Sequence, residues 1–195
     1  MLFRSKPGNI LIDKNNKLFL ADFGSAFCLG KGGDNSYGTI CYVPPEGVLE
    51  ADEHGFPADM WAVGCVLIEI VFSNILFFGK QRDDPLEPKK EFKGDLILLH
   101  ERVLGRYPIG LVERGSERGK ALYYPSLILD DNKRRVQRAC ANEFSLDKER
   151  VCPLEKILKP GLFLEVLKGM LTLDPRERIT PEEVLEKMQK KGGGK

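Results

Sequence analysis

The residues of this 195-residue chain that could do chemistry gather in five short clusters. In chain order these are Lys6-Pro-Gly-Asn-Ile-Leu-Ile12, Asp22-Phe-Gly24, Gly38-Thr-Ile-Cys-Tyr-Val-Pro-Pro-Glu46, Asp59-Met-Trp-Ala-Val-Gly64 and Leu173-Asp-Pro-Arg-Glu-Arg-Ile-Thr180. Each cluster alone is a weak signal, since Asp-Phe-Gly is a common turn tripeptide and Asn9 by itself is most simply a turn residue. Asp22 and Asn9 nevertheless carry a carboxylate and an amide oxygen, the hard ligands that suit Mg²⁺. The order of the clusters and the elements between them make the signal specific.

Apolar patterning and turn residues predict the elements that position these clusters. Short apolar runs over 10–13 and 18–22 flank a Lys-Asn-Asn-Lys turn, which predicts a small β-hairpin near the N-terminus. This hairpin joins Asn9 to Asp22 and would bring both to one edge. Residues 24–45 form a long loop, a length usually kept for function. Residues 106–152 are weakly periodic and predict no defined element.

Four helices are predicted, over 60–78, 95–104, 162–173 and 181–190. The first is apolar on nearly every face and, with Pro57 near its start, is long enough to cross a bilayer. Glu69 at its middle is expensive in lipid and favours a buried core helix instead. The last has Thr180 as N-cap, Pro181 at the first helical position and Glu183 to complete a capping box. A frayed tail, 191–195, would follow.

The five clusters in this order resemble the second half of the eukaryotic protein-kinase signature set, from Lys6 to about Lys190. The resemblance implies a mainly α (α+β) fold, the kinase C-terminal lobe, in which a helical bundle surrounds one buried central helix. Residues 1–190 would be this partial domain, with the apolar stretch 60–78 as the central helix rather than a membrane span.

The branch that the chain resembles is the LAMMER (Clk-like) group of CMGC serine/threonine kinases. The resemblance rests on Asp22-Phe-Gly-Ser-Ala, on Glu101-Arg-Val-Leu-Gly and on a long insert over 106–150. The sequence departs from that branch at Val43 and Pro44, because members of the branch have arginine and alanine at these two positions.

The family resemblance also implies roles for single residues. Asn9 and Asp22 would hold Mg²⁺ and through it ATP, and Lys6 would face the γ-phosphate. Residues 25–45 would be the activation segment. Glu46 and Arg178 resemble the ion pair that ties the end of that segment to the helical lobe, and Asp59 resembles the aspartate that receives backbone N–H groups of the catalytic loop. The candidate phosphosites are Ser25, Ser36, Tyr37 and Thr39, although plain loop polarity is the better explanation for each of them.

Where a kinase has His-Arg-Asp-Leu, this chain reads Leu2-Phe-Arg-Ser5, so Arg4 stands in place of the catalytic aspartate. Arginine cannot accept the substrate's proton, and general-base assistance is typically worth ~10²–10⁴-fold in rate. The sequence also contains no glycine-rich loop and no strand lysine for the phosphates. We therefore expect the chain alone to bind ATP very poorly, to be inactive, and to leave an apolar face of its central helix uncovered.

Two functions follow from these observations. In the first, the chain is a truncated serine/threonine kinase, an ATP-to-protein phosphotransferase; the retained Lys6, Asn9, Asp22, Glu46 and Arg178 favour it. In the second, it is a non-catalytic, kinase-like binding or scaffold module, a pseudokinase; Arg4, Val43 and Pro44 favour that.

Composition narrows the partners and the compartment. The formal net charge is +1, from 30 basic and 29 acidic residues, which gives no global attraction to nucleic acid or acidic lipid. We expect a protein substrate or partner protein, with no direct nucleic-acid or membrane contact. The five cysteines are odd in number and show no Cys-x-x-Cys spacing, so they predict free thiols in a reducing compartment. The expected location is intracellular, nuclear or cytoplasmic.

Overall fold

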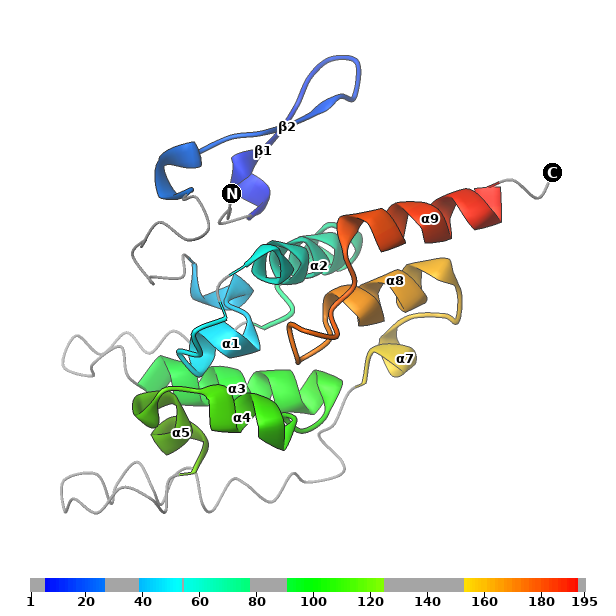
Figure 1. The fold of residues 1–195 in the computed structure, drawn as a ribbon. Coiled ribbons are helices and arrows are strands. Elements are labelled where there is room, and N and C mark those ends of the chain that lie inside the picture. Colours follow the sequence, from blue (N-terminus) through cyan, green and yellow to red (C-terminus); the bar gives the residue numbers. More distant parts are fainter. Residues whose placement is uncertain (1–5, 27–38, 54, 78–90, 125–152, 193–195) are drawn as a thin grey trace.

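The computed structural model describes residues 6–26, 39–53, 55–77, 91–124 and 153–192. These residues form a mainly helical body with one two-stranded antiparallel sheet (Figure 1). The expected fold class, mainly α with a small hairpin near the N-terminus, is therefore confirmed.

The hairpin consists of β1 (Ile10–Ile12) and β2 (Leu18–Leu20), paired in the register Ile10↔Leu20, Leu11↔Phe19 and Ile12↔Leu18. Asp13 organises the turn, because its Oδ1 accepts hydrogen bonds from the backbone N–H groups of Asn15 and Lys17, both at 2.8 Å. Asn16 adopts φ 61°, a left-handed conformation that asparagine tolerates. The predicted hairpin is present.

The central helix is α2 (Phe56–Phe72), and most of its side chains from Ala58 to Ile68 are buried. It ends six residues before the predicted Phe78, which lies outside the described residues. The helix stops because Ser73 takes a left-handed conformation, φ 53° and ψ 31°. The chain then turns back, and the Phe77 ring stacks on Trp61 with centroids 5.5 Å apart. Burial of this ring outweighs the intrinsic helical tendency of the apolar run.

Seven further helices lie in the described part of the chain: α1 (Pro45–Val48), α3 (Glu91–Leu104), α4 (Ile109–Arg114), α5 (Glu117–Tyr123), α7 (Leu154–Ile157), α8 (Leu162–Met170) and α9 (Pro181–Gly192). Both α4 and α5 fall in the stretch for which the sequence predicted no element. The helix α8 is three residues shorter than expected, and α9 is two residues longer than the expected Lys190, so residues 191 and 192 belong to it rather than to a tail.

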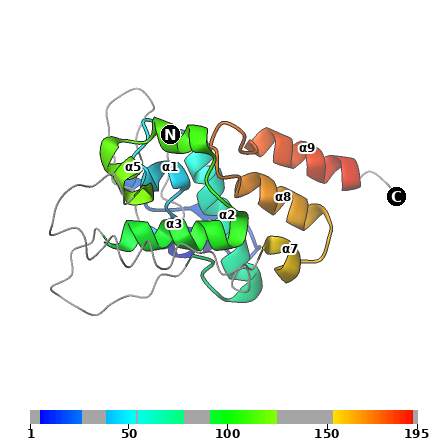
Figure 2. The ribbon, with the colours of Figure 1, turned by 90° about the horizontal axis from the view of Figure 1, so that it is seen from below.

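Figure 2 shows α2 in the middle of the body, with α1 and α5 toward one side and α8 and α9 toward the other. Trp61, Cys65 and Ile68 of α2 share one core with Leu111 and Leu167, and Met60 packs into a smaller cluster with α8 and α9. Gly64 allows this approach, because a Cβ there would lie 3.0 Å from a Leu171 side-chain atom. Among the described residues, no helix is both long and apolar enough to cross a membrane.

Candidate functional site

The hairpin brings Asn9 and Asp22 together at its open end. The ladder continues one pair beyond the strands, since the Ala21 N–H donates to the Asn9 carbonyl at 2.8 Å. The Asn9 side-chain amide then donates to Asp22 Oδ2 at 3.4 Å, and this contact is exposed to solvent. Residues thirteen positions apart in the sequence therefore present a carboxylate and an amide side chain to the same region of solvent.

The backbone of Asp22 is left-handed, with φ 61° and ψ 66°. Aspartate, like asparagine, tolerates this conformation better than most residues with a side chain, and here it directs the chain from the hairpin into the 3₁₀ helix Phe23–Ser25. Lys6 lies one turn before Asn9, whose N–H donates to the Lys6 carbonyl at 2.9 Å across the 3₁₀ helix Pro7–Asn9. The three predicted site residues Lys6, Asn9 and Asp22 thus come from one continuous structural unit.

The side chains of Asn9 and Asp22 fit a Mg²⁺ ion that is shared with a phosphate group better than a metal ion held by protein ligands alone. Mg²⁺ is usually bound through one or two carboxylates together with substrate phosphates and water. Asp22 supplies one carboxylate and Asn9 carries an amide oxygen. Among the described residues no group of three or more His, Cys, Asp or Glu side chains could hold a metal ion. A Mg²⁺ ion held by this pair would need further oxygen ligands, such as phosphate oxygens or water.

Two of the four candidate phosphosites lie among the described residues. Ser25 ends the 3₁₀ helix Phe23–Ser25, and Thr39 is exposed at the N-cap of the 3₁₀ helix Ile40–Tyr42. Ser36, Tyr37 and Arg4 lie outside the described residues.

The end of the predicted activation segment contacts α2 through Tyr42. The Tyr42 hydroxyl donates to Glu69 Oε2 at 2.6 Å. Burial together with this hydrogen bond raises the pKa of Tyr42. Neighbouring Cys41 and Cys65 are free and buried, which raises their pKa values, so both thiols stay protonated at neutral pH.

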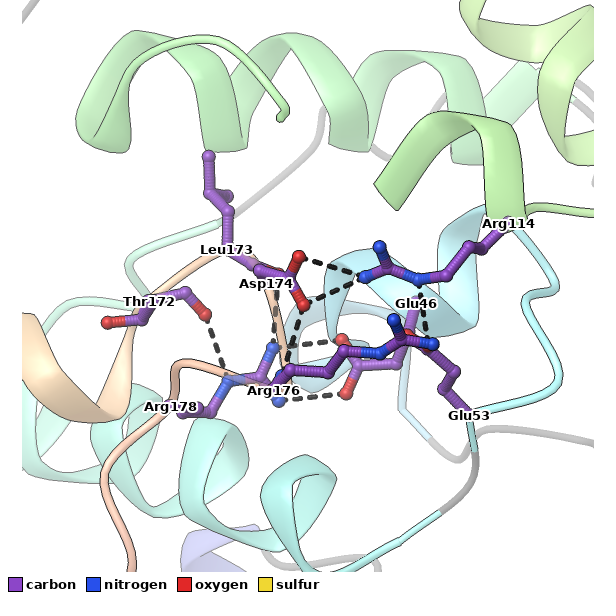
Figure 3. A network of polar contacts seen from close by, with 8 residues as sticks. All are labelled: Glu46, Glu53, Arg114, Thr172, Leu173, Asp174, Arg176 and Arg178. Atoms are coloured by element: carbon purple, nitrogen blue, oxygen red, sulfur yellow. Dashed lines mark hydrogen bonds and ion pairs between the residues drawn. The ribbon is translucent and has the colours of Figure 1, made fainter. Parts of the chain in front are cut away.

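Glu46 and Arg178, 132 positions apart, form a bidentate ion pair in the interior (Figure 3). Arg178 Nη1 and Nη2 donate to the two carboxylate oxygens of Glu46 at 2.8 and 2.9 Å, and neither side chain is accessible to solvent. The same guanidinium donates to the carbonyls of Thr172, Pro57 and Leu173 at 2.9, 2.7 and 3.3 Å. All five of its N–H donors are therefore satisfied, as a buried charge requires.

This ion pair ties together three distant segments. Glu46 lies in α1, Pro57 opens α2, and Arg178 precedes α9. The Arg178 guanidinium also sits over the Trp61 ring, 5.2 Å from its centroid. Asp59, whose predicted partner is the catalytic loop, lies half-buried in the first turn of α2, while residues 1–5 of that loop lie outside the described part.

A second charged network, which the sequence did not predict, lies beside the first (Figure 3). Arg114 of α4 donates to both oxygens of Asp174 at 2.8 and 2.9 Å and pairs through Nε with Glu53 at 2.7 Å. Arg176 pairs with the same Glu53. Although burial alone would favour the neutral acid, the hydrogen bond from Arg114 and the adjoining N–H of Arg176 lower the pKa of Asp174.

A third polar cluster, also not predicted, is buried between α3 and α5. Tyr107 and His100 share a 2.6 Å hydrogen bond between the hydroxyl and Nδ1, and Glu101 Oε1 accepts from the Tyr107 N–H and the Tyr123 hydroxyl, each at 3.2 Å. Complete burial lowers the pKa of His100 to about 3, with the charge of Arg178 adding to the effect. The imidazole is therefore neutral, so the Tyr107 hydroxyl can donate to it. Neither network has a local sequence signature.

Comparison with known proteins identifies the class. The protein kinase domain family matches residues 5–188, so the chain belongs to the protein kinase family. It is 32% identical over 188 residues to mitogen-activated protein kinase MKC1 of Candida albicans, covering 92% of this chain and 32% of that protein. It is 29% identical to mitogen-activated protein kinase mpkC of Emericella nidulans, covering 92% and 37%. It is also 27% identical to cell division control protein 2 homolog 1 of Trypanosoma brucei brucei, covering 93% and 55%.

These relatives make the chain a CMGC-type protein kinase sequence, while the finer resemblance to the LAMMER group stays a prediction. The chain spans from about a third to about half of their length. A solved MAP kinase of Leishmania major has the same fold, with a TM-score of 0.66 at 19% identity, covering 98% of this chain and 50% of that one.

Proposed function

We propose that residues 1–190 are the C-terminal lobe of a serine/threonine protein kinase, whose family activity is transfer of the γ-phosphate of ATP to a protein hydroxyl. The chain spans 32% of the length of one fungal kinase and 55% of a trypanosomal one. The activity of a whole kinase is therefore part of what we propose and not a property of this chain alone. The observation that carries the proposal is the contact between Asn9 and Asp22 at the open end of the hairpin.

In this proposal Asp22 and Asn9 hold Mg²⁺ against the phosphates of ATP. The metal supplies neutralisation of the charge that develops on the transferring phosphoryl group. The left-handed backbone of Asp22 fixes the direction of its carboxylate, and the amide of Asn9 orients it through the 3.4 Å hydrogen bond. Lys6, one turn before Asn9, adds positive charge toward the γ-phosphate. The buried Glu46–Arg178 pair holds the end of the activation segment on the helical body.

We further propose that the chain alone transfers no phosphate. Arg4 occupies the position of the general base, and its guanidinium stays protonated at any working pH. The second candidate, a non-catalytic kinase-like binding module, is favoured by the same Arg4 and by the exposed apolar hairpin.

Mn²⁺ binding tests the metal site, because this ion broadens nearby NMR signals even when binding is weak. We expect Mn²⁺ with ATP to broaden the signals of Asn9, Asp22 and Ala21 first, and Asp22→Asn to abolish that effect. Asp13→Asn is the matched control, because Asp13 lies at the opposite end of the same hairpin. Broadening that begins at the turn, or that survives Asp22→Asn, would rule out the proposed site.

A further inference from the structure

Two ring nitrogens in the core have no hydrogen-bond partner in the part of the chain that the structure describes. They are the indole Nε1 of Trp61, on α2, and the imidazole Nε2 of His100, on α3. Both side chains are inaccessible to solvent, with 0% of each exposed. The large majority of buried polar side-chain atoms are hydrogen-bonded, either to protein or to ordered water. These two nitrogens are therefore an exception that needs a physical explanation.

The hydrogen bond on the other side of the His100 ring makes Nε2 a donor. Burial lowers the pKa of His100 to about 3, so the ring is neutral and carries one N–H and one acceptor nitrogen. Among the described residues, Nδ1 of His100 is the only hydrogen-bond partner of the buried Tyr107 hydroxyl, at 2.6 Å. The hydroxyl donates to Nδ1, since its hydrogen would otherwise be buried without an acceptor. The ring proton is then on Nε2.

The two unpartnered donors belong to one cluster of rings. The rings of Trp61 and His100 meet edge to face, with centroids 4.8 Å apart and planes at 64°. Phe77 packs against both of them, with centroid distances of 5.5 and 4.4 Å. The guanidinium of Arg178 lies 5.2 Å from the centroid of the Trp61 ring. Phe77 has no polar atom and Arg178 has only donors, so neither supplies an acceptor for the two N–H groups.

We propose that this cluster binds one internal water molecule, whose oxygen accepts the N–H groups of Trp61 and His100. Water fits the site because its oxygen can accept two hydrogen bonds and because it brings no net charge into the core. A cation is the wrong ligand, since it would face two N–H donors and the guanidinium of Arg178. Buried waters make about three hydrogen bonds, mostly to polar groups that would otherwise be unsatisfied.

This water joins the two buried polar networks of the helical body. Trp61 packs on Arg178, the cation of the pair with Glu46 at the end of the predicted activation segment. His100 belongs to the cluster with Tyr107 between α3 and α5. A hydrogen-bonded path through the water therefore runs from α2 to α3. The inference goes beyond the kinase-lobe proposal and depends neither on the metal site nor on activity.

Solution NMR of the full chain tests this proposal. Trp61 is the only tryptophan and His100 is one of two histidines, so both rings give few signals. In a rotating-frame experiment with selective excitation of water, we expect a dipolar cross peak at the indole Hε1, opposite in sign to an exchange peak. Long-range ¹H–¹⁵N spectra should show His100 protonated at Nε2. A wild type without the dipolar cross peak, or with the proton on Nδ1, overturns the proposal.

Two variants identify the source of the cross peak. Tyr107→Phe is the matched control, because it removes the neighbouring hydroxyl proton, which could relay magnetisation from water, and it keeps His100. Its cross peak should remain. In His100→Phe with Tyr107→Phe, Trp61 is the only one of these polar groups left, and a site with one polar partner does not hold a water. Its cross peak should be lost. Loss of the peak in the control, or its survival in the double variant, overturns the proposal. The wild-type spectra decide the question even if the double variant does not fold.

Discussion

Replacing Arg178 with methionine should remove a large part of the stability of this fold. The substitution leaves the Glu46 carboxylate buried without its cation, and it takes the hydrogen-bond donor from the carbonyls of Thr172, Pro57 and Leu173. Breaking a buried ion pair by removing one partner costs about 3–5 kcal/mol. That is a substantial share of the ~5–15 kcal/mol by which a domain is stable.

Urea denaturation followed by circular dichroism measures this loss, and the fluorescence of Trp61, the only tryptophan, gives a second probe of the same core. Arg118→Met is the matched control, because Arg118 lies 3.7 Å from Glu50 at the surface with 59% of its side chain exposed. Exposed pairs of this kind contribute about 0–1 kcal/mol. A loss for Arg178→Met no larger than that of the control would refute the reasoning.

If Arg178→Met does not fold, Glu46→Leu with Arg178→Met provides the second measurement. This pair removes both buried charges, so the double variant should be more stable than Arg178→Met alone, with a coupling energy of about 1–3 kcal/mol. A double variant less stable than Arg178→Met would show that the unpaired Glu46 charge is not what destabilises the single variant.

Three further perturbations test other parts of the structure. Gly119→Ala should destabilise the fold by about 2 kcal/mol or more in urea, because its Cβ would lie 1.8 Å from the Leu49 carbonyl oxygen; an unchanged midpoint would contradict the close approach of α5 to this carbonyl. Arg114→Met should cost about 1–3 kcal/mol and raise the acid midpoint, because the pKa of Asp174 is then no longer held down; identical acid titrations of the two proteins would contradict this. His100 has a folded pKa of about 3, whereas the unfolded chain takes up its proton near 6.5. The stability of the wild type relative to His100→Gln should therefore fall by about 1.4 kcal/mol per pH unit between those values as pH decreases, and a difference that does not change with pH would show that His100 is not buried as a neutral ring.

Local patterns predicted the local parts of this structure. The hairpin follows from two apolar runs and a turn, and the reciprocal hydrogen bonds between Thr180 and Glu183, at 2.8 and 3.2 Å, confirm the capping box. Both features depend on residues within a few positions of one another, so the sequence contains what is needed to recognise them.

Features set by tertiary contacts were predicted less well. The early end of α2 depends on Phe77 returning to Trp61, which no local pattern shows. The pairing of Glu46 with Arg178 was anticipated only through the family resemblance, because these residues are 132 positions apart. The contact of Arg114 with Asp174, across 60 positions, had no such guide. Long-range polar contacts of this kind depend on how the helices pack.

Phosphate transfer by the purified chain tests most directly the proposal that this kinase lobe carries metal-binding residues yet cannot act alone. The assay follows transfer of labelled γ-phosphate from ATP with Mg²⁺ to a generic basic protein substrate, for the wild type and for Asp22→Asn. Because the proposal puts Arg4 at the position of the general base, we expect both proteins to give the same background incorporation. Incorporation by the wild type that Asp22→Asn abolishes would contradict the proposal and show that the chain is an active kinase in its own right.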